Sequence, residues 1–185
     1  MHGLKLYLVT HHWSRGNRVF GSNLSKIPSR TEFTNIVCTS LDKKFCNFEY
    51  CHLKSVNRSY KYFSVKMRLL KIPVTKVKIN LGLYQRFSGY RPFLYDVTID
   101  ACRFLKNETY NPVANYFYEL IRDHSNMNHT CPFDHDLIVE KVTTEFMNHR
   151  PKNVLPFAKG DYLMEVNWIG YDINRALTKL YFTLS

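Results

Sequence analysis

The sequence predicts a mainly β protein, an antiparallel two-sheet sandwich with one inserted α-helix. Three observations lead to this prediction. Segments of alternating apolar and polar residues recur along the chain, as in Ser59–Leu70, where Phe63, Val65 and Met67 share one side. Glycine, proline, asparagine and serine residues separate these segments. One stretch after Asn111 has helical spacing instead.

The expected strands follow one another with short breaks. In chain order they are Phe33–Thr39, Phe45–Val56, Ser59–Leu70, Val74–Arg86, Phe93–Leu105, Cys131–Val142, Asp161–Trp168 and Arg175–Leu184. The Ile72-Pro73 step ends the third strand, because proline has no N–H to donate to a β ladder. The Ser88-Gly89 pair provides the turn after the fourth strand.

The expected helix begins after Asn111, a good N-cap residue, with Pro112 at the first helical position. Its apolar residues recur at helical spacing and include Val113, Phe117 and Ile121. A helix with one apolar face must bury that face, so we expect it to pack on a sheet.

The length of 185 residues fits one domain with one core. We expect residues 32–185 to form this β-sandwich domain and residues 1–31 to be a disordered or atypical N-terminal segment. A signal peptide is not evident, since the apolar stretch Leu4–Val9 is short and contains Lys5. No apolar run is long enough to span a bilayer as a helix.

The formal net charge of +11 raises nucleic acid or an anionic surface as a partner. The basic residues, however, alternate with apolar ones, as do Lys76 and Lys78 with Val77 and Ile79. This pattern is typical of the solvated face of an amphipathic strand, so we expect no nucleic-acid partner. Sulfated glycans or anionic lipid head groups are the alternative partners of these charges.

Three Asn-x-Ser/Thr triplets, at Asn57, Asn107 and Asn128, lie in polar breaks between apolar segments. Such triplets receive sugar only in the secretory pathway, where cysteines also pair. We therefore expect a secreted, extracellular glycoprotein with these three asparagines as acceptors.

The five cysteines allow at most two disulfides. A bridge between Cys102 and Cys131 would close a loop of about 29 residues and stabilise the fold by roughly 3 to 4 kcal/mol. Either Cys38 or Cys46 could pair with Cys51, and the residues alone leave this choice open.

The sequence contains no catalytic motif of a hydrolase or of a zinc protease, and no glycine-rich phosphate-binding loop. We therefore expect no enzyme activity and no cofactor. Cys131 with His129 and His135 could be drawn as metal ligands. A structural zinc site, however, usually takes four ligands that come as two pairs along the chain, and the sequence shows only one such group of ligands. The preferred interpretation is a disulfide cysteine beside exposed histidines, with no metal.

From Phe33 to Ser185 the chain resembles a large insect family of secreted proteins of unknown function, related to the CheB chemosensory proteins. The matching strings are FTNIVC at 33–38, VNRSYKY at 56–62, PFLYDVTIDACRFLKN at 92–107, NPVANYFYELI at 111–121, NHTCPFDHD at 128–136, LPFAKGDYL at 155–163 and YDINRA at 171–176. Through Cys131-Pro132-Phe133, Gly160-Asp161-Tyr162 and Trp168 it is also similar to the lipid-recognition fold of the Niemann-Pick type C sterol carrier and the ganglioside activator.

The resemblance implies an immunoglobulin-like cup whose two sheets enclose an apolar cavity. The wall residues expected on this basis are Phe63, Met67, Ile79, Leu81, Phe117, Phe133, Met164 and Trp168. The resemblance also favours disulfides Cys38–Cys51 and Cys102–Cys131 with Cys46 free, although a carrier-like Cys-x4-Cys spacing keeps Cys46–Cys51 as an alternative.

The function expected from these observations is non-enzymatic binding of a lipid, sterol or hydrocarbon pheromone between the two sheets, and the resemblance suggests a setting in insect chemosensation or reproduction. The expected partners are this hydrophobic small molecule and a membrane receptor, and the expected state is a monomer. The alternative hypothesis is an extracellular protein- or glycan-interaction module with a fully packed core.

Overall fold

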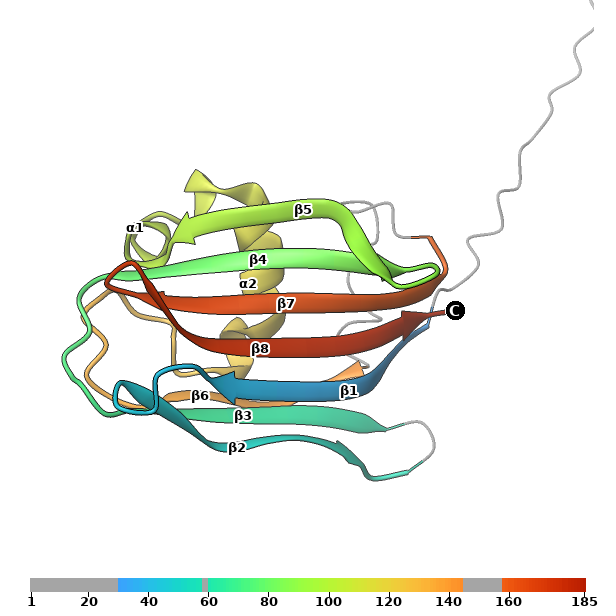
Figure 1. Ribbon diagram of the computed structural model, residues 1–185, viewed down its shortest axis with the longest axis horizontal. Helices are drawn as coiled ribbons and strands as arrows, with labels where there is room; N and C mark the ends of the chain where they lie inside the picture. The colour runs from blue at the N-terminus through green and yellow to red at the C-terminus, as the bar shows by residue number, and fades with distance from the viewer. Residues whose placement is uncertain (1–29, 58–59, 145–157) are drawn as a thin grey trace, which may run out of the picture.

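The computed structural model describes residues 30–57, 60–144 and 158–185. Within them, two antiparallel sheets pack against each other (Figure 1). The larger has five strands in the order β1-β8-β7-β4-β5, and the smaller has three in the order β2-β3-β6. The strands are β1 (Thr31–Ser40), β2 (Cys46–Ser55), β3 (Lys61–Leu69), β4 (Val77–Arg86), β5 (Tyr90–Asp100), β6 (Leu137–Thr143), β7 (Gly160–Gly170) and β8 (Ile173–Leu184). This architecture confirms the predicted mainly β, two-sheet fold class.

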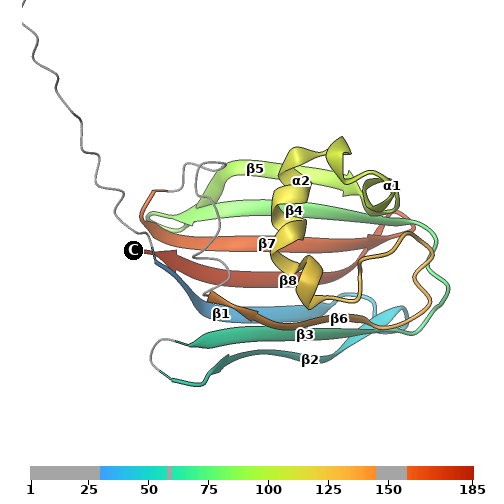
Figure 2. The same cartoon turned by 180° about the vertical axis from the view of Figure 1, so that it is seen from behind.

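Two α-helices lie between β5 and β6 in the chain: α1 (Ala101–Lys106) and α2 (Pro112–Ile121). A 3-10 turn follows each of them, at Glu108–Tyr110 and Arg122–His124. Helix α2 begins as predicted, because the Asn111 side chain accepts a hydrogen bond of 3.0 Å from the Ala114 N–H. Figure 2 shows α2 running across the strands of the five-stranded sheet.

The main core fills the space between the three-stranded sheet and the β1-β8 side of the larger sheet. Phe33 and Phe182 contribute from the larger sheet, and Phe63, Met67 and Val142 from the smaller one; all five are buried. The rings of Phe33 and Phe63 meet edge to face, with centroids 5.1 Å apart. Each fully buried side chain of this size contributes about 1.5 to 3 kcal/mol, so this packing holds the two sheets together.

Two disulfides tie the elements together. Cys38 of β1 bonds to Cys51 of β2 across the two sheets, with Cα atoms 6.1 Å apart. Cys102 of α1 bonds to Cys131 in the loop before β6, with Cα atoms 5.3 Å apart. These are the pairs that the resemblance implied. Cys46 is unpaired and buried, so the alternative Cys46–Cys51 bridge does not form.

The structure corrects two expected strands. The fifth ends at Asp100 rather than Leu105, because the Asp100 carboxylate accepts a hydrogen bond from the Arg103 N–H (2.9 Å) and caps helix α1 there. The sixth begins at Leu137 rather than Cys131. Ahead of it, Phe133 makes only an isolated pair of backbone hydrogen bonds with Val74, of 2.7 and 2.9 Å.

The predicted N-terminal segment lies outside the described residues up to position 29. Arg30 and Thr31 are described: Arg30 exchanges backbone hydrogen bonds with Ser185, and Thr31 opens β1 opposite Leu184. The first strand therefore starts two residues before the expected Phe33.

Candidate ligand-binding cavity

A cavity of about 150 Å³ lies between helix α2 and strands β4 and β7 of the five-stranded sheet. Strand β5, helix α1, the loop carrying Phe133 and the start of β6 close its sides. The three-stranded sheet packs over the other half of the large sheet, so its contribution to the cavity is Leu137 of β6. The arrangement differs from the expected one: the space is under the helix rather than between the two sheets.

The sheet wall is built from alternate residues of two paired strands. Ile79 and Leu81 of β4 face the cavity together with Val166 and Trp168 of β7. The antiparallel register places Ile79 opposite Trp168 and Leu81 opposite Val166. Because side chains alternate across a strand, paired residues point to the same face, and a two-strand stripe of apolar groups results.

The helix wall consists of residues spaced three or four apart on α2. Ala114, Phe117, Tyr118 and Ile121 face the sheet. The small side chain of Ala114 leaves room that a larger residue would occupy. Tyr118 stacks edge to face on Phe104 of α1, with centroids 5.4 Å apart. The two helices therefore close the cavity as one packed unit.

The polar groups of the two amphipathic lining residues are both engaged by protein atoms. The Tyr118 hydroxyl donates to the backbone carbonyl of Met127 (3.2 Å), and the Trp168 indole N–H donates to the Thr178 hydroxyl (3.1 Å). Burial raises the pKa of Tyr118, so it stays a neutral phenol. Every lining side chain among the described residues is apolar or aromatic. The cavity thus offers hydrophobic contact and no charged partner.

Six of the eight expected wall residues line this cavity: Ile79, Leu81, Phe117, Phe133, Met164 and Trp168. The other two, Phe63 and Met67, belong to the core between the sheets, where Met67 also lines a smaller void. The expectation placed them in the wall because it put the cavity between the sheets, where close packing leaves little space.

Sequence reasoning missed several lining residues. These are Val77, Ile99, Ala101, Phe104, Leu105, Ala114, Tyr118, Ile121, Met127, Leu137 and Val166. The two-residue period of β4 and β7 could have identified Val77 and Val166. The lining residues of α1 were hidden because this segment was expected to be a strand.

A smaller void of about 30 Å³ adjoins the cavity on the side of the three-stranded sheet. Val77, Phe133, Leu137 and Trp168 line both spaces and form the partition between them. Cys46 also lines the small void, and burial raises the pKa of its thiol. A ligand longer than the main cavity could extend into the small void only by displacing one of the partition side chains.

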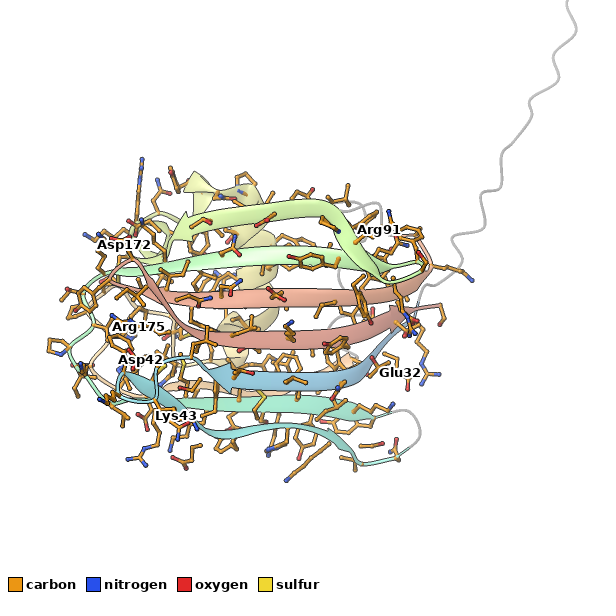
Figure 3. The ribbon with its side chains drawn as sticks, viewed as in Figure 1. Glu32, Asp42, Lys43, Arg91, Asp172 and Arg175 are labelled. Atoms are coloured by element: carbon orange, nitrogen blue, oxygen red, sulfur yellow. A yellow bond between two sulfur atoms is a disulfide. The ribbon has the colours of Figure 1, made fainter. Side chains whose placement is uncertain are left out.

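Arg175 covers the outer end of the small void. Its guanidinium lies 4.3 Å from the centre of the Phe45 ring, donates to the Gly170 carbonyl (3.0 Å) and pairs with Asp42. Figure 3 shows Asp42, Arg175 and Asp172 together at one end of the sheets. The hydrogen-bonded guanidinium of Arg175 therefore closes this end of the interior together with the apolar side chains.

Several basic side chains in or next to the strands have acidic neighbours. Lys76 and Lys78 both bond Asp172, and their hydrogen bonds lower the pKa of Asp172 to about 2. Lys66 lies 3.0 Å from Glu49, whose hydrogen bond raises the pKa of Lys66. These pairs lie on or near the solvated faces, as the alternating pattern predicted, and they reduce the positive field available to an anionic partner.

The expected glycosylation acceptors Asn57, Asn107 and Asn128 are exposed. Their use as acceptors stays a prediction. No helix within the described residues is long and apolar enough to cross a membrane.

Fold and cavity together define a class of protein: a mainly β, two-sheet domain with an apolar internal cavity. Residues 79–164 match the model of a family described as "Protein of unknown function (DUF1091)". The matched segment is somewhat less than half of the chain and runs from β4 into β7, so it includes most of the cavity wall.

No curated protein matches the chain. Among solved structures, the chain is similar to a Niemann-Pick type C2 protein from the Japanese carpenter ant. The two share 14% identity, the match covers 83% of this chain and 90% of that one, and the TM-score is 0.29.

Proposed function

We propose that this protein binds a small apolar molecule in the cavity beneath helix α2 and acts as a non-enzymatic carrier. The observation that supports this most is a cavity of about 150 Å³ whose described lining is entirely apolar or aromatic. Apolar side chains that line an unfilled space lack packing partners, which costs stability unless a ligand supplies the missing contacts. A protein that keeps such a cavity without using it gives up a substantial part of its stability.

The size of the cavity limits the ligand. An engineered apolar cavity of about 150 Å³ in another protein stays dry and binds benzene. A ligand of roughly six to eight carbons fits a space of that size, whereas a whole sterol does not. The favoured class is therefore a short hydrocarbon, or the end of an acyl chain whose remainder lies outside.

The expected affinity follows from the buried carbons. Each methylene removed from water contributes about 0.8 kcal/mol, so six carbons give about 5 kcal/mol. This free energy corresponds to a Kd of about 0.2 mM. Tighter binding requires the ligand to enter the adjoining void by moving Phe133 or Trp168.

The proposed location is extracellular. Two disulfides, both joining separate elements, form and persist in oxidising compartments. The exposed triplet asparagines fit the same location. The family resemblance suggests a role in chemosensation. In that role the protein would have two partners, the apolar ligand and a membrane receptor.

The alternative, an interaction module with a fully packed core, receives less support. Its premise is a filled interior, and the cavity beneath α2 is not filled. Three of the lysines that it could use, Lys66, Lys76 and Lys78, also have acidic neighbours, which weakens their attraction for an anionic glycan.

A series of straight-chain alkanes tests the proposal. Trp168 lines the cavity and reports binding by its fluorescence once Trp13, the other tryptophan, is replaced by phenylalanine in all samples. The affinity should rise about fourfold per added methylene, the equivalent of about 0.8 kcal/mol, and level off near eight carbons. Absence of saturable binding for every member of the series would contradict the proposal.

A further inference from the structure

Two histidines of the loop before β6 face each other. The Nε2 atoms of His129 and His135 are 3.3 Å apart, and the ring centroids are 4.9 Å apart. Both side chains are half-buried, so the space beside the two nitrogens is reachable from solvent. This pair plays no part in the cavity lining.

The opposite nitrogen of each ring is engaged by an acceptor. Nδ1 of His129 lies 2.7 Å from the backbone carbonyl oxygen of Thr130, and Nδ1 of His135 lies 3.0 Å from a carboxylate oxygen of Asp134. A carbonyl and a carboxylate can only accept, so each Nδ1 carries the hydrogen and donates it. In the neutral rings both Nε2 atoms are then unprotonated.

In that state the two Nε2 lone pairs lie 3.3 Å apart with no hydrogen between them, which is unfavourable unless a positive group lies beside both nitrogens. Moving the hydrogen of one ring to its Nε2 would let that ring donate to the other, but only with loss of the hydrogen bond from its Nδ1 to Thr130 or Asp134. A cation shared by the two rings, either a proton or a metal ion, satisfies both Nδ1 hydrogen bonds and the Nε2 contact at the same time.

The separation agrees with a shared metal. Two imidazole nitrogens bound at 2.0 to 2.1 Å to one tetrahedral zinc lie about 3.3 to 3.4 Å apart. Metal-bound histidines also donate their other ring N–H to a carboxylate or a backbone carbonyl. His135 has the first kind of partner and His129 has the second.

We propose that His129 and His135 bind one divalent transition-metal ion through their Nε2 atoms, with Asp134 and the Thr130 carbonyl as positioning groups. No third histidine, cysteine or carboxylate joins them to make a larger cluster within the described residues. Water or an external ligand fills the remaining coordination positions. Imidazole ligands favour Cu²⁺ over Zn²⁺, and both over the hard cations Mg²⁺ and Ca²⁺.

The site adjoins the cavity through one ring contact. The His129 ring meets the Phe133 ring edge to face, with centroids 5.1 Å apart, and Phe133 is part of the partition between the two internal spaces. A metal ion on His129 would therefore fix the loop that carries a cavity wall residue. The metal site itself does not depend on the proposed ligand.

The test measures Zn²⁺ binding by isothermal titration of the full, disulfide-bonded chain at neutral pH, with Cu²⁺ as a second probe. His2, His11, His12 and His149 are replaced by glutamine throughout, because these histidines lie outside the described residues and could bind the metals. The variants H129Q and H135Q each remove one ligand. The variant H52Q, on β2, is the matched control.

We expect one Zn²⁺ per chain, tighter Cu²⁺ binding, and an affinity at least about tenfold lower in H129Q and in H135Q, since removing even a supporting partner costs 10- to 100-fold. H52Q should bind like its parent. D134N should weaken binding about tenfold and D134E should restore part of it, while the unfolding midpoint stays unchanged.

A site-specific readout comes from the imidazole ¹⁵N resonances. Zn²⁺ should shift the Nε2 signals of His129 and His135 and leave those of His52 unchanged. If H129Q or H135Q binds Zn²⁺ as well as the parent, or if these two Nε2 signals do not move, no metal ion joins the two rings and the proposal is overturned.

Discussion

Filling the space beneath α2 is the sharpest perturbation that the structure offers. The substitution Ala114→Leu adds three carbons to a buried residue whose side chain lines the cavity. At about 0.8 kcal/mol per carbon, the gain in the free energy of unfolding has an upper bound of about 2.4 kcal/mol. Some strain is expected in a partly filled cavity, so the net stabilisation should be about 1 to 2 kcal/mol.

The same substitution should weaken binding of hexane or octane at least about tenfold, a loss of about 1.4 kcal/mol, because the added side chain occupies the ligand's space. Urea unfolding and the Trp168 fluorescence titration measure the two effects. Val113→Leu on the same helix is the matched control, since Val113 is not among the lining residues. Unchanged affinity together with lower stability in the Ala114→Leu variant would refute the reasoning, because it would mean that no usable space exists there.

Three further predictions concern the surroundings of the cavity. Phe63→Ala should lower the free energy of unfolding by about 3 to 5 kcal/mol in urea titrations, because Phe63 packs between the sheets. The same variant should bind alkanes with unchanged affinity. A loss of affinity without a loss of stability would contradict this placement of Phe63. The pKa of Asp172 is lowered to about 2 by hydrogen bonds from Lys76 and Lys78, so its contribution to stability is full above about pH 4 and is lost as the pH falls toward 2. The urea midpoints of wild type and Asp172→Asn should therefore converge over that range, and parallel curves would count against the ion pair. Burial raises the pKa of Cys46, so its thiol should resist alkylation by iodoacetamide in the native protein and react after unfolding in urea. Mass spectrometry of the labelled protein measures both reactions. Rapid labelling of the native protein would contradict the burial of Cys46.

Strands and the main helix could be predicted because their patterns are local. The alternation of Val77, Ile79 and Leu81 marks β4, and Asn111-Pro112 marks the start of α2. Helix α1 was missed because it is only six residues long and follows a strand without a break in hydrophobicity. The Asp100 cap that ends the strand is a single side-chain contact, and many aspartates outside helix termini have the same local sequence context.

The position of the cavity could not be predicted, because it depends on which element covers which half of the large sheet. Phe63 and Phe117 are both apolar residues of amphipathic elements, yet one meets Phe33 across a packed interface and the other lines the open space. The pairing of the His129 and His135 rings is likewise a tertiary feature. Their spacing in a loop says nothing about the direction of the two Nε2 atoms.

The most direct test of the account is a crystal structure of the protein under xenon pressure or with bound benzene. The account predicts density between α2 and strands β4 and β7, in contact with Ile79, Phe117 and Trp168. Density between the two sheets beside Phe63, or no bound atom in the interior, would contradict the claim that the carrier space lies beneath the helix.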